Sequence, residues 1–429
     1  MFGVNIRKMV FWGLDYIKGS PVRKHYNDIR NRMENQSSPE EKVEEILQYV
    51  KYNVPFYSAQ KELNTLCDFP VMTKALYNKN IHMVRSTKYL NDNSLHWVRT
   101  SGSTGTPFSA PQDFDKRNRT KAELIYFHNV SGWKLGDRYL FIRAWVAYNA
   151  SLSKRIMNNF VPFEATNFNE ENKEKLLRII KNEKNLKILF GYSSVITDLA
   201  EYIIENKACV PNKKIKLVVV DSDTLLHGAK EKIEEAFGCS VMNRYDNEEH
   251  GVLACMKPGD DCWTVNTASY YIELLKIDSD EQCLPGEVGR VVVTDLTNHA
   301  MPFIRYDVGD LAVSNDYNGK YAVHLHSLEG KANDIIKDTS GNRIGNVSLA
   351  AYFELFMSIK KYQLIQESAK EYRLKIILEE ENSSNVTDKL IKELKQCLGK
   401  DANIVIEIVP EIETTKAGKY RPVISLLKE

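Results

Sequence analysis

The stretch RTSGSTGTPF, residues 99–108, combines residue types that could bind phosphate. Glycines allow backbone N–H groups to converge on an anion, and hydroxyl side chains supply further hydrogen-bond donors. The stretch is not a P-loop, because no lysine follows its second glycine. Two interpretations stay open, a phosphate-binding loop and a solvated surface turn. The candidate phosphate-binding residues are Thr100, Ser101, Gly102, Ser103, Thr104, Gly105 and Thr106.

Four further segments follow in the chain: NRYDNEEHG (243–251), MPFIRYDVGDLA (301–312), EGKANDIIKDTSGNRI (329–344) and TTKAGKYRPVI (414–424). Together with the first stretch they resemble, in the same order, the motifs of the adenylate-forming superfamily. That superfamily includes the acyl-CoA synthetases, the adenylation domains of peptide synthetases and the luciferases. The short length and the segments NVPFYS (53–58), FPVMTKALY (69–77) and QLIQES (363–368) most resemble phenylacetate–CoA ligases and the ligases of capsular-polysaccharide biosynthesis. The resemblance covers nearly the whole chain.

The resemblance implies a site for ATP and Mg²⁺. The hydroxyl-rich loop would then wrap the phosphates, and Glu249 would bind Mg²⁺ as a hard oxygen ligand. Tyr245 would stack on adenine, and Asp223 would line the adenine pocket. Asp310 would accept hydrogen bonds from both ribose hydroxyls, since one carboxylate offers two oxygens to a vicinal diol.

The resemblance implies that Lys419 is the catalytic residue. Its ammonium would bridge the attacking carboxylate and the α-phosphate, where negative charge gathers in the transition state. The resemblance also implies a rotation of a small C-terminal domain about a hinge near residue 333. Lys331 would contact the ribose or a phosphate there, in place of the usual arginine.

Three other positions depart from the family pattern. Asn333 replaces an aspartate in the hinge segment, and Asp246 and Glu248 replace the more frequent glycine and threonine of the central motif. The two acids add negative charge beside the nucleotide, so we expect a differently shaped acyl pocket.

The implied reaction is ATP-dependent ligation of a small carboxylic acid through an acyl-adenylate. The acceptor stays open between a thiol, with coenzyme A as co-substrate, and an amine such as an amino sugar or amino acid. A pathway in cell-envelope polysaccharide biosynthesis fits either acceptor. The alternative from another class is a non-catalytic relative that only binds nucleotide.

The elements that must position these residues form an α/β chain. Short β-branched runs such as KIKLVVVDSD alternate with amphipathic helices, which predicts parallel strands with crossover helices. From about residue 263 the pattern predicts antiparallel strands. We expect a large domain over residues 1–329 and a small α+β cap domain over residues 330–429.

Composition excludes some partners. The chain has 429 residues, with 43% hydrophobic residues and a formal net charge of +1. A net charge this close to zero does not favour nucleic acid as a partner. No apolar run reaches the roughly 18 residues of a membrane span. We expect a cytoplasmic enzyme, and assembly as a homodimer stays open.

The N-terminal twenty residues predict an amphipathic helix, with contact to a membrane surface as the alternative. Seven cysteines without a CxxC pair favour a reducing compartment. Cys239, Cys255, Cys262 and Cys283 lie near His250 in the sequence, and a zinc site there is an alternative to ordinary buried thiols.

Overall fold

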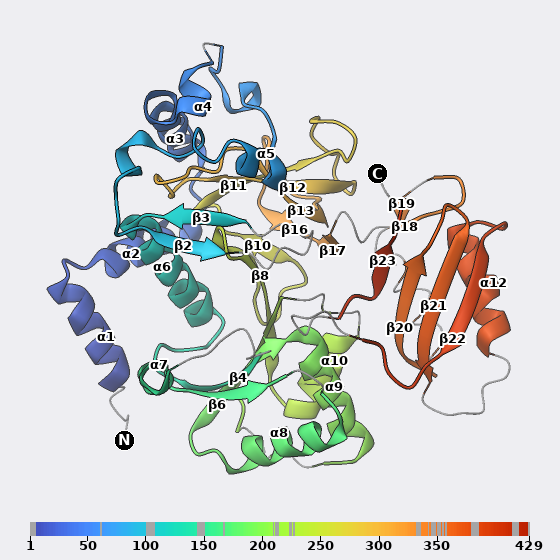
Figure 1. Cartoon of the computed structure of the whole chain (residues 1–429). Helices are drawn as coiled ribbons and strands as arrows, with labels where there is room; N and C mark the ends of the chain where they lie inside the picture. Colours follow the sequence, from blue (N-terminus) through green and yellow to red (C-terminus); the bar gives the residue numbers. More distant parts are fainter. Residues whose placement is uncertain are drawn as a thin grey trace.

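The computed structural model of the chain shows a large lobe and a C-terminal unit beside it (Figure 1). It describes residues 6–60, 62–99, 108–143, 151–165, 168–208, 210, 214–222, 225, 228–331, 336–341, 343–344, 349, 353, 356, 358–378, 386–413 and 420–427.

An eight-stranded sheet with the order β16-β10-β9-β8-β7-β6-β4-β5 forms the centre of the large lobe. Strands β4 to β8 are mutually parallel, whereas β9, β10 and β16 pair antiparallel. The strands are β4 (Arg138–Arg143), β5 (Phe160–Glu164), β6 (Leu186–Tyr192), β7 (Leu217–Asp221), β8 (Ser240–Asn247), β9 (Gly251–Met256), β10 (Trp263–Val265) and β16 (His324–Leu325). The predicted parallel strands are confirmed.

Helices cover both faces of this sheet. Leu176, Leu199 and Ile233 pack on one face from α8 (Glu170–Asn182), α9 (Ser193–Glu205) and α10 (Ala229–Phe237). Ile29 and Ala122 pack on the other face from α2 (Pro21–Glu34) and α6 (Phe114–Val130). The two outlying helices are α1 (Ile6–Ile17) and α7 (Leu152–Asn158). Parallel strands buried on both sides explain continuous apolar runs such as LVVV in β7.

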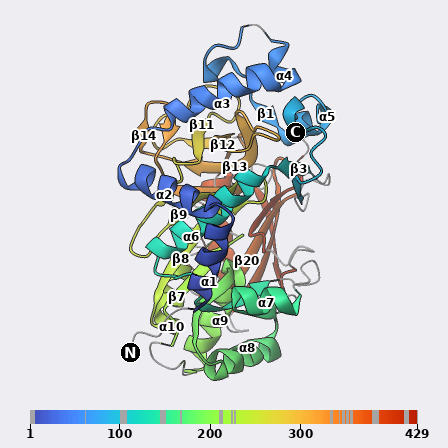
Figure 2. The ribbon, with the colours of Figure 1, turned by 90° about the vertical axis from the view of Figure 1, so that its left-hand side faces the viewer.

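A second sheet is antiparallel except for the parallel pair of β1 with β13. It has the order β1-β13-β12-β11, with β17 also paired to β13. Its strands are β1 (Met72–Thr73), β11 (Tyr270–Leu275), β12 (Val288–Asp295), β13 (Tyr306–Val313) and β17 (Ser327–Lys331). Around it lie α3 (Glu40–Asn53), α4 (Pro55–Ser58), η1 (Leu66–Asp68), α5 (Lys74–Lys79), η2 (Thr87–Tyr89), β14 (Tyr317–Asn318) and β15 (Tyr321–Ala322). Figure 2 shows α3 lying across the top of this sheet.

A separate hairpin is formed by β2 (His96–Arg99) and β3 (Ser109–Gln112). The two strands pair antiparallel, and the last pair is Arg99 with Ser109. The predicted phosphate loop connects them, and residues 100–107 lie outside the described part of the chain.

The C-terminal unit has its own core. A four-stranded sheet with the order β22-β21-β20-β23 packs through Leu374 and Ile404 against Leu390 and Leu394 of α12. Its elements are β18 (Ile336–Lys337), β19 (Arg343–Ile344), β20 (Ile359–Gln366), β21 (Glu371–Leu378), α12 (Val386–Leu398), β22 (Asn403–Ile408) and β23 (Val423–Ser425). The predicted fold class, a large α/β domain with an antiparallel subdomain and a small α+β unit, is confirmed.

Ion pairs join the two parts. Lys360 lies 2.8 Å from Glu205, and Lys361 lies 2.9 Å from Asp198, both acids being on α9. Lys331 still belongs to the sheet of the large lobe, whereas Ile336 belongs to the C-terminal core. The domain boundary between residues 329 and 330 stays a prediction.

A substitution at Gly191 would test how closely the strands of the central sheet pack. A Cβ at this position would lie 2.7 Å from Ile142 Cβ and 2.9 Å from its carbonyl oxygen. We expect Gly191→Ala to lower the free energy of unfolding by about 2 kcal/mol, because β4 and β6 must move apart. Denaturant unfolding measures the change.

Gly13→Ala is the matched control. Nothing lies within 4 Å of a Cβ there, and the position is helical. Alanine should raise stability by about 0.5 kcal/mol, because glycine disfavours a helix. Equal stabilities for the two variants would contradict this packing argument.

Candidate active site

Four of the predicted site residues fall within the described structure: Tyr245, Glu249, Asp310 and Lys331. The remaining predicted residues, Thr100 to Thr106, Asp223 and Lys419, lie outside it, as does Asn333. Their predicted roles stay predictions.

Tyr245, Asp310 and Lys331 come together at the edge of the large lobe. The Tyr245 hydroxyl donates to Asp310 Oδ2 at 2.8 Å, and Lys331 Nζ lies 2.5 Å from Asp310 Oδ1. The pairing of β13 with β17 places Lys331 directly opposite Asp310. Burial raises the pKa of the Tyr245 hydroxyl well above its usual value, and the Asp310 charge adds to the shift. Tyr245 is therefore a neutral donor at physiological pH.

Glu249 lies in the turn between β8 and β9, and only 6% of its surface is exposed. Its Oε1 accepts from the Tyr306 hydroxyl at 3.3 Å and lies 3.7 Å from Lys74 Nζ. Gln112 holds the backbone, since its Nε2 donates to the Glu249 carbonyl oxygen at 3.2 Å. Lys74 was not among the predicted site residues, because the segment that holds it, FPVMTKALY (69–77), was read only for family likeness.

The described end of the predicted phosphate loop lies in the same cluster. Phe108, which is fully buried, stacks on Tyr306 with ring centroids 6.2 Å apart. Lys74 Nζ lies 5.7 Å from the centroid of the Phe108 ring. The loop therefore returns to β3 beside the residues that hold Glu249.

A buried polar network underlies the Glu249 turn. Lys116 Nζ forms a fully buried ion pair with Asp295 at 2.7 Å and donates to the Tyr270 hydroxyl at 3.0 Å. That hydroxyl donates in turn to the carbonyl oxygen of His250 at 2.7 Å. Glu123 accepts from the Val252 N–H at 3.2 Å. The network thus fixes the backbone on the C-terminal side of Glu249.

Gly251 is required at the end of this turn. Its φ is +119°, and a Cβ there would lie 2.6 Å from Glu123 Oε2. A side chain would meet both an unfavourable backbone conformation and the buried carboxylate.

A second charged cluster lies at the carboxyl ends of the parallel strands, where ligands bind in open α/β sheets. Asp221 ends β7 and pairs with Arg143 at the end of β4. Arg244 in β8 lies 2.6 Å from Asp221 and 2.9 Å from Asp246. Burial raises the pKa of Asp246 to about 6, although Arg244 opposes the shift. Of these residues only Asp246 was singled out from sequence. Arg244 lies two residues before it in the same segment, and Arg143 lies in none of the quoted segments.

The metal prediction was tested on side-chain geometry. Among the described residues, no three or more His, Cys, Asp or Glu side chains lie close enough to hold a metal ion. This result gives no support to a zinc site around Cys255 and His250. Mg²⁺ commonly uses one carboxylate together with substrate phosphates and water. The single Glu249 carboxylate beside the loop end fits that requirement.

Residues 336–426 match the family model described as the CapK C-terminal domain. The curated protein CapK of Staphylococcus aureus is 24% identical over 97% of this chain and 95% of its own length. These matches agree with the resemblance to capsule ligases.

Solved structures share the fold. A 2-hydroxyisobutyryl-CoA ligase in the postadenylation state, in complex with R3-HIB-AMP, has a TM-score of 0.69 at 18% identity. The match covers 90% of this chain and 88% of that one. The amide bond synthetase McbA from Marinactinospora thermotolerans has a TM-score of 0.55 at 16% identity, covering 75% of this chain and 66% of its own. The fold that the sequence motifs predicted is confirmed.

His250 makes the network beneath the turn sensitive to acid. Burial lowers the pKa of its imidazole to about 3, with Lys116 adding to the shift and Asp295 opposing it. The folded-state pKa is below the unfolded value, so this stability is complete above about pH 6.5 and is lost as the pH falls. Between pH 7 and 5 we expect His250 to account for a loss of about 2 kcal/mol.

The test compares denaturant unfolding of His250→Gln and wild type across this pH range. The variant should be less stable at pH 7 but lose less stability on acidification. His82→Gln, at an exposed position, is the control and should follow wild type. An unchanged pH dependence in His250→Gln would show that His250 is already protonated or still solvated in the folded state.

Proposed function

We propose that this chain, whose fold is that of the adenylate-forming ligases, activates a carboxylic acid with ATP and then transfers the acyl group. The observation that supports this most directly is the joining of Tyr245, Asp310 and Lys331 in one hydrogen-bonded cluster. Three motif residues from separate segments meet there, each of a type that binds a nucleoside.

In the proposed first step, a carboxylate oxygen of the acid attacks the α-phosphorus of ATP. The bond from that phosphorus to the bridging oxygen breaks, and pyrophosphate leaves with the electron pair. Lys419 would stabilise the charge on the attacking and α-phosphate oxygens. Mg²⁺ bound to Glu249 would neutralise charge on the phosphates. Asp310 would orient the ribose.

In the proposed second step, a thiol or amine attacks the acyl carbon, loses its proton and displaces AMP. Solved relatives include both kinds of enzyme, CoA ligases and an amide bond synthetase. The chain's motifs resemble capsule ligases, which supports a role in cell-envelope polysaccharide assembly. There an amine on a sugar or amino acid would be the acceptor, and coenzyme A is the alternative.

Exchange of labelled pyrophosphate into ATP tests the first step. We expect exchange that depends on an added acid, and Lys419→Ala should reduce it by about 100-fold or more while nucleotide still binds. Lys416→Ala, three residues away in the same segment, is the matched control. If no acid supports exchange, the chain is instead a nucleotide-binding relative without this chemistry.

Asp310→Asn tests the nucleotide site separately. Replacing the carboxylate should weaken nucleotide binding by about 30-fold, because charge-assisted bonds to two ribose hydroxyls are lost. Asp316→Asn is the control, since Asp316 pairs with His324 in the same lobe. Equal affinities for both variants would contradict the proposed role of Asp310.

We also propose that the acid carries a second polar group. Buried atoms Arg143 Nη1 and Arg244 Nε have no hydrogen-bond partner among the described residues. Leaving such donors unpaired is costly, and a hydroxyl or anionic oxygen of the substrate would satisfy them. The position at the carboxyl ends of β4 and β8 supports an acyl-binding role.

The acid screen therefore compares hydroxy acids, amino acids and dicarboxylic acids with fatty and aryl acids. Polar acids should give the faster exchange, and Arg143→Met should raise KM for the acid by about tenfold with KM for ATP unchanged. Arg138→Met, at the other end of β4, is the matched control. Preference for a fatty or aryl acid would overturn this part of the proposal.

A further inference from the structure

Helix α1 presents its apolar side outward. On the structure, six large apolar side chains of this helix are between 53% and 80% exposed: Ile6, Met9, Val10, Leu14, Tyr16 and Ile17. Their spacing places them on one side of the helix. A surface helix of a globular protein normally turns this side toward the core.

The inward side of α1 is held by other contacts. Asp15 is buried, and its carboxylate accepts from the backbone N–H groups of Val22 and Arg23, at 3.0 and 3.1 Å. Trp12 lies under the Arg23 guanidinium, 4.6 Å from the ring centroid. These contacts dock α1 on the start of α2 and leave its apolar side facing out.

Helix α7 continues this surface. Arg7 Nε donates to the Ile156 carbonyl oxygen at 3.4 Å, so the two helices are neighbours, as Figure 2 also shows. Leu152, Ile156 and Met157 of α7 are between 60% and 71% exposed. The outward apolar surface therefore consists of these three residues and the six of α1. Exposed apolar side chains gathered on two neighbouring helices mark an interaction site more often than scattered ones do.

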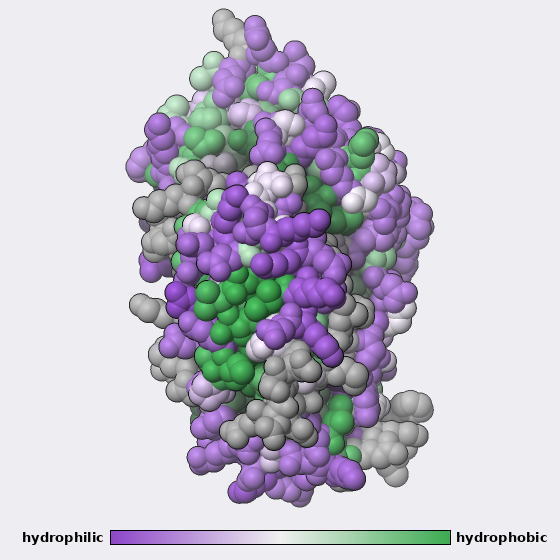
Figure 3. Space-filling view, turned by 90° about the vertical axis from the view of Figure 1, so that its right-hand side faces the viewer, coloured by the Kyte–Doolittle hydropathy of each residue, from purple (hydrophilic) through white to green (hydrophobic). Residues whose placement is uncertain are grey.

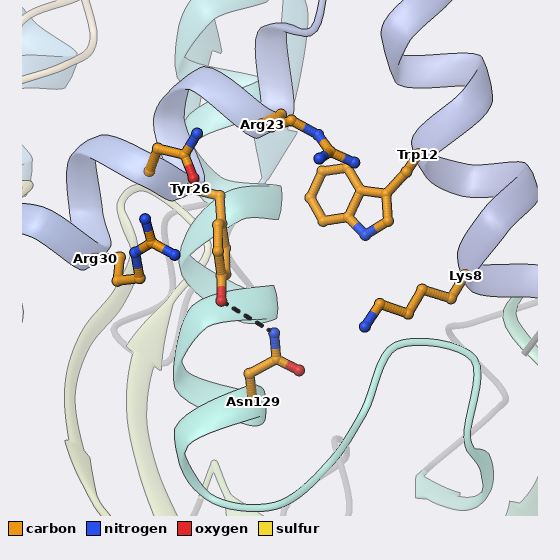
Figure 4. Close-up of a pocket in the computed structure, with 7 residues that line it drawn as sticks. Lys8, Trp12, Arg23, Tyr26, Arg30 and Asn129 are labelled. Atoms are coloured by element: carbon orange, nitrogen blue, oxygen red, sulfur yellow. Dashed lines mark hydrogen bonds between the residues drawn. The ribbon is translucent and has the colours of Figure 1, made fainter. Parts of the chain in front are cut away.

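The charges around this surface have one sign. The two helices carry Arg7, Lys8, Lys154 and Arg155, and their only acid is the buried Asp15. A cavity of about 270 Å³ adjoins the inner side of α1, between α1, α2 and α6. Its lining is Lys8, Trp12, Arg23, Tyr26, Asn27, Arg30 and Asn129, without a carboxylate (Figure 4).

We propose that the outward apolar surface docks on an anionic lipid bilayer, with α1 lying in the plane of the interface. Apolar side chains would enter the acyl boundary, and the cations on the opposite side would lie at the level of the lipid phosphates. Lys8, Arg23 and Arg30 in the adjoining cavity would contact a headgroup phosphate there.

Charge favours a bilayer over a second copy of the chain. In a symmetric dimer this surface would meet itself, which would bring the same cations together without an exposed acid on either helix. An anionic lipid surface supplies the opposite charge. None of the described helices combines the length and apolar character needed to span a bilayer. The proposed mode of contact is interfacial and needs no span.

Sedimentation with vesicles tests the proposal. Wild type should bind vesicles of phosphatidylcholine mixed with phosphatidylglycerol more tightly than vesicles of phosphatidylcholine alone. The double variant Val10→Gln, Ile17→Gln should weaken this binding by about tenfold or more, because two exposed apolar groups lose their lipid contact. Both positions face outward, so thermal unfolding should be unchanged.

The matched control is Val405→Gln, Ile408→Gln. These two residues are also more than half exposed, on β22 of the C-terminal unit. That unit lies on the other side of the molecule, whose surface in Figure 3 also carries hydrophobic residues among hydrophilic ones. The control should sediment like wild type. Equal weakening in both double variants would mean that α1 is not the docking element.

Arg30→Gln tests the role of charge. It should lower affinity for the mixed vesicles by about threefold and leave binding to neutral vesicles unchanged. Arg178→Gln, exposed on α8, is the control.

Failure of wild type to bind either vesicle would overturn the proposal. So would a dimer of wild type that Val10→Gln, Ile17→Gln dissociates without any vesicle binding, since the surface would then be an interface between copies.

Discussion

A fully buried ion pair between Lys116 and Asp295 is the interaction on which the site depends. Lys116 lies in the first turn of α6 and Asp295 ends β12, so the pair joins a helix on the central sheet to the second sheet. Asp295 also caps the following loop through the Thr297 N–H at 2.8 Å. Removing either partner would leave a charge uncompensated in the interior, at a cost of about 3 to 5 kcal/mol.

The Lys116–Asp295 pair is connected to both motif segments of the large lobe, the turn that carries Glu249 and the strand that carries Asp310. Tyr270, which accepts from Lys116, holds the His250 carbonyl oxygen and thereby the turn that carries Glu249. The loop capped by Asp295 leads into β13, which carries Tyr306 and Asp310. The contacts of Lys116, Asp295 and Tyr270 hold the two sheets together. Glu249 and Tyr306, which are far apart in the sequence, therefore come into contact. The C-terminal unit has a separate core and contacts α9 through ion pairs.

The sequence predicted the fold class, which is confirmed, and it named candidate site residues whose roles stay predictions. Tyr245 and Asp310 could be named as candidates because each stands at a fixed position of its own motif segment, 243–251 and 301–312. Lys74 and Arg143 could not, since their positions depend on pairing between distant strands that no local pattern encodes. The N-terminal helix was predicted as amphipathic, but the side that faces outward was not. That orientation depends on Asp15, whose partners are backbone groups of the next helix.

A crystal structure with ATP and Mg²⁺ tests the central claim most directly, which is that this cluster is a nucleotide site. In the present structure Tyr245 and Lys331 hold the two oxygens of Asp310. We expect the ribose hydroxyls to donate hydrogen bonds to Asp310 and to displace Lys331 from at least one oxygen, with the metal about 2.1 Å from Glu249 or one water away. Nucleotide bound elsewhere, with the Asp310–Lys331 pair intact, would contradict it.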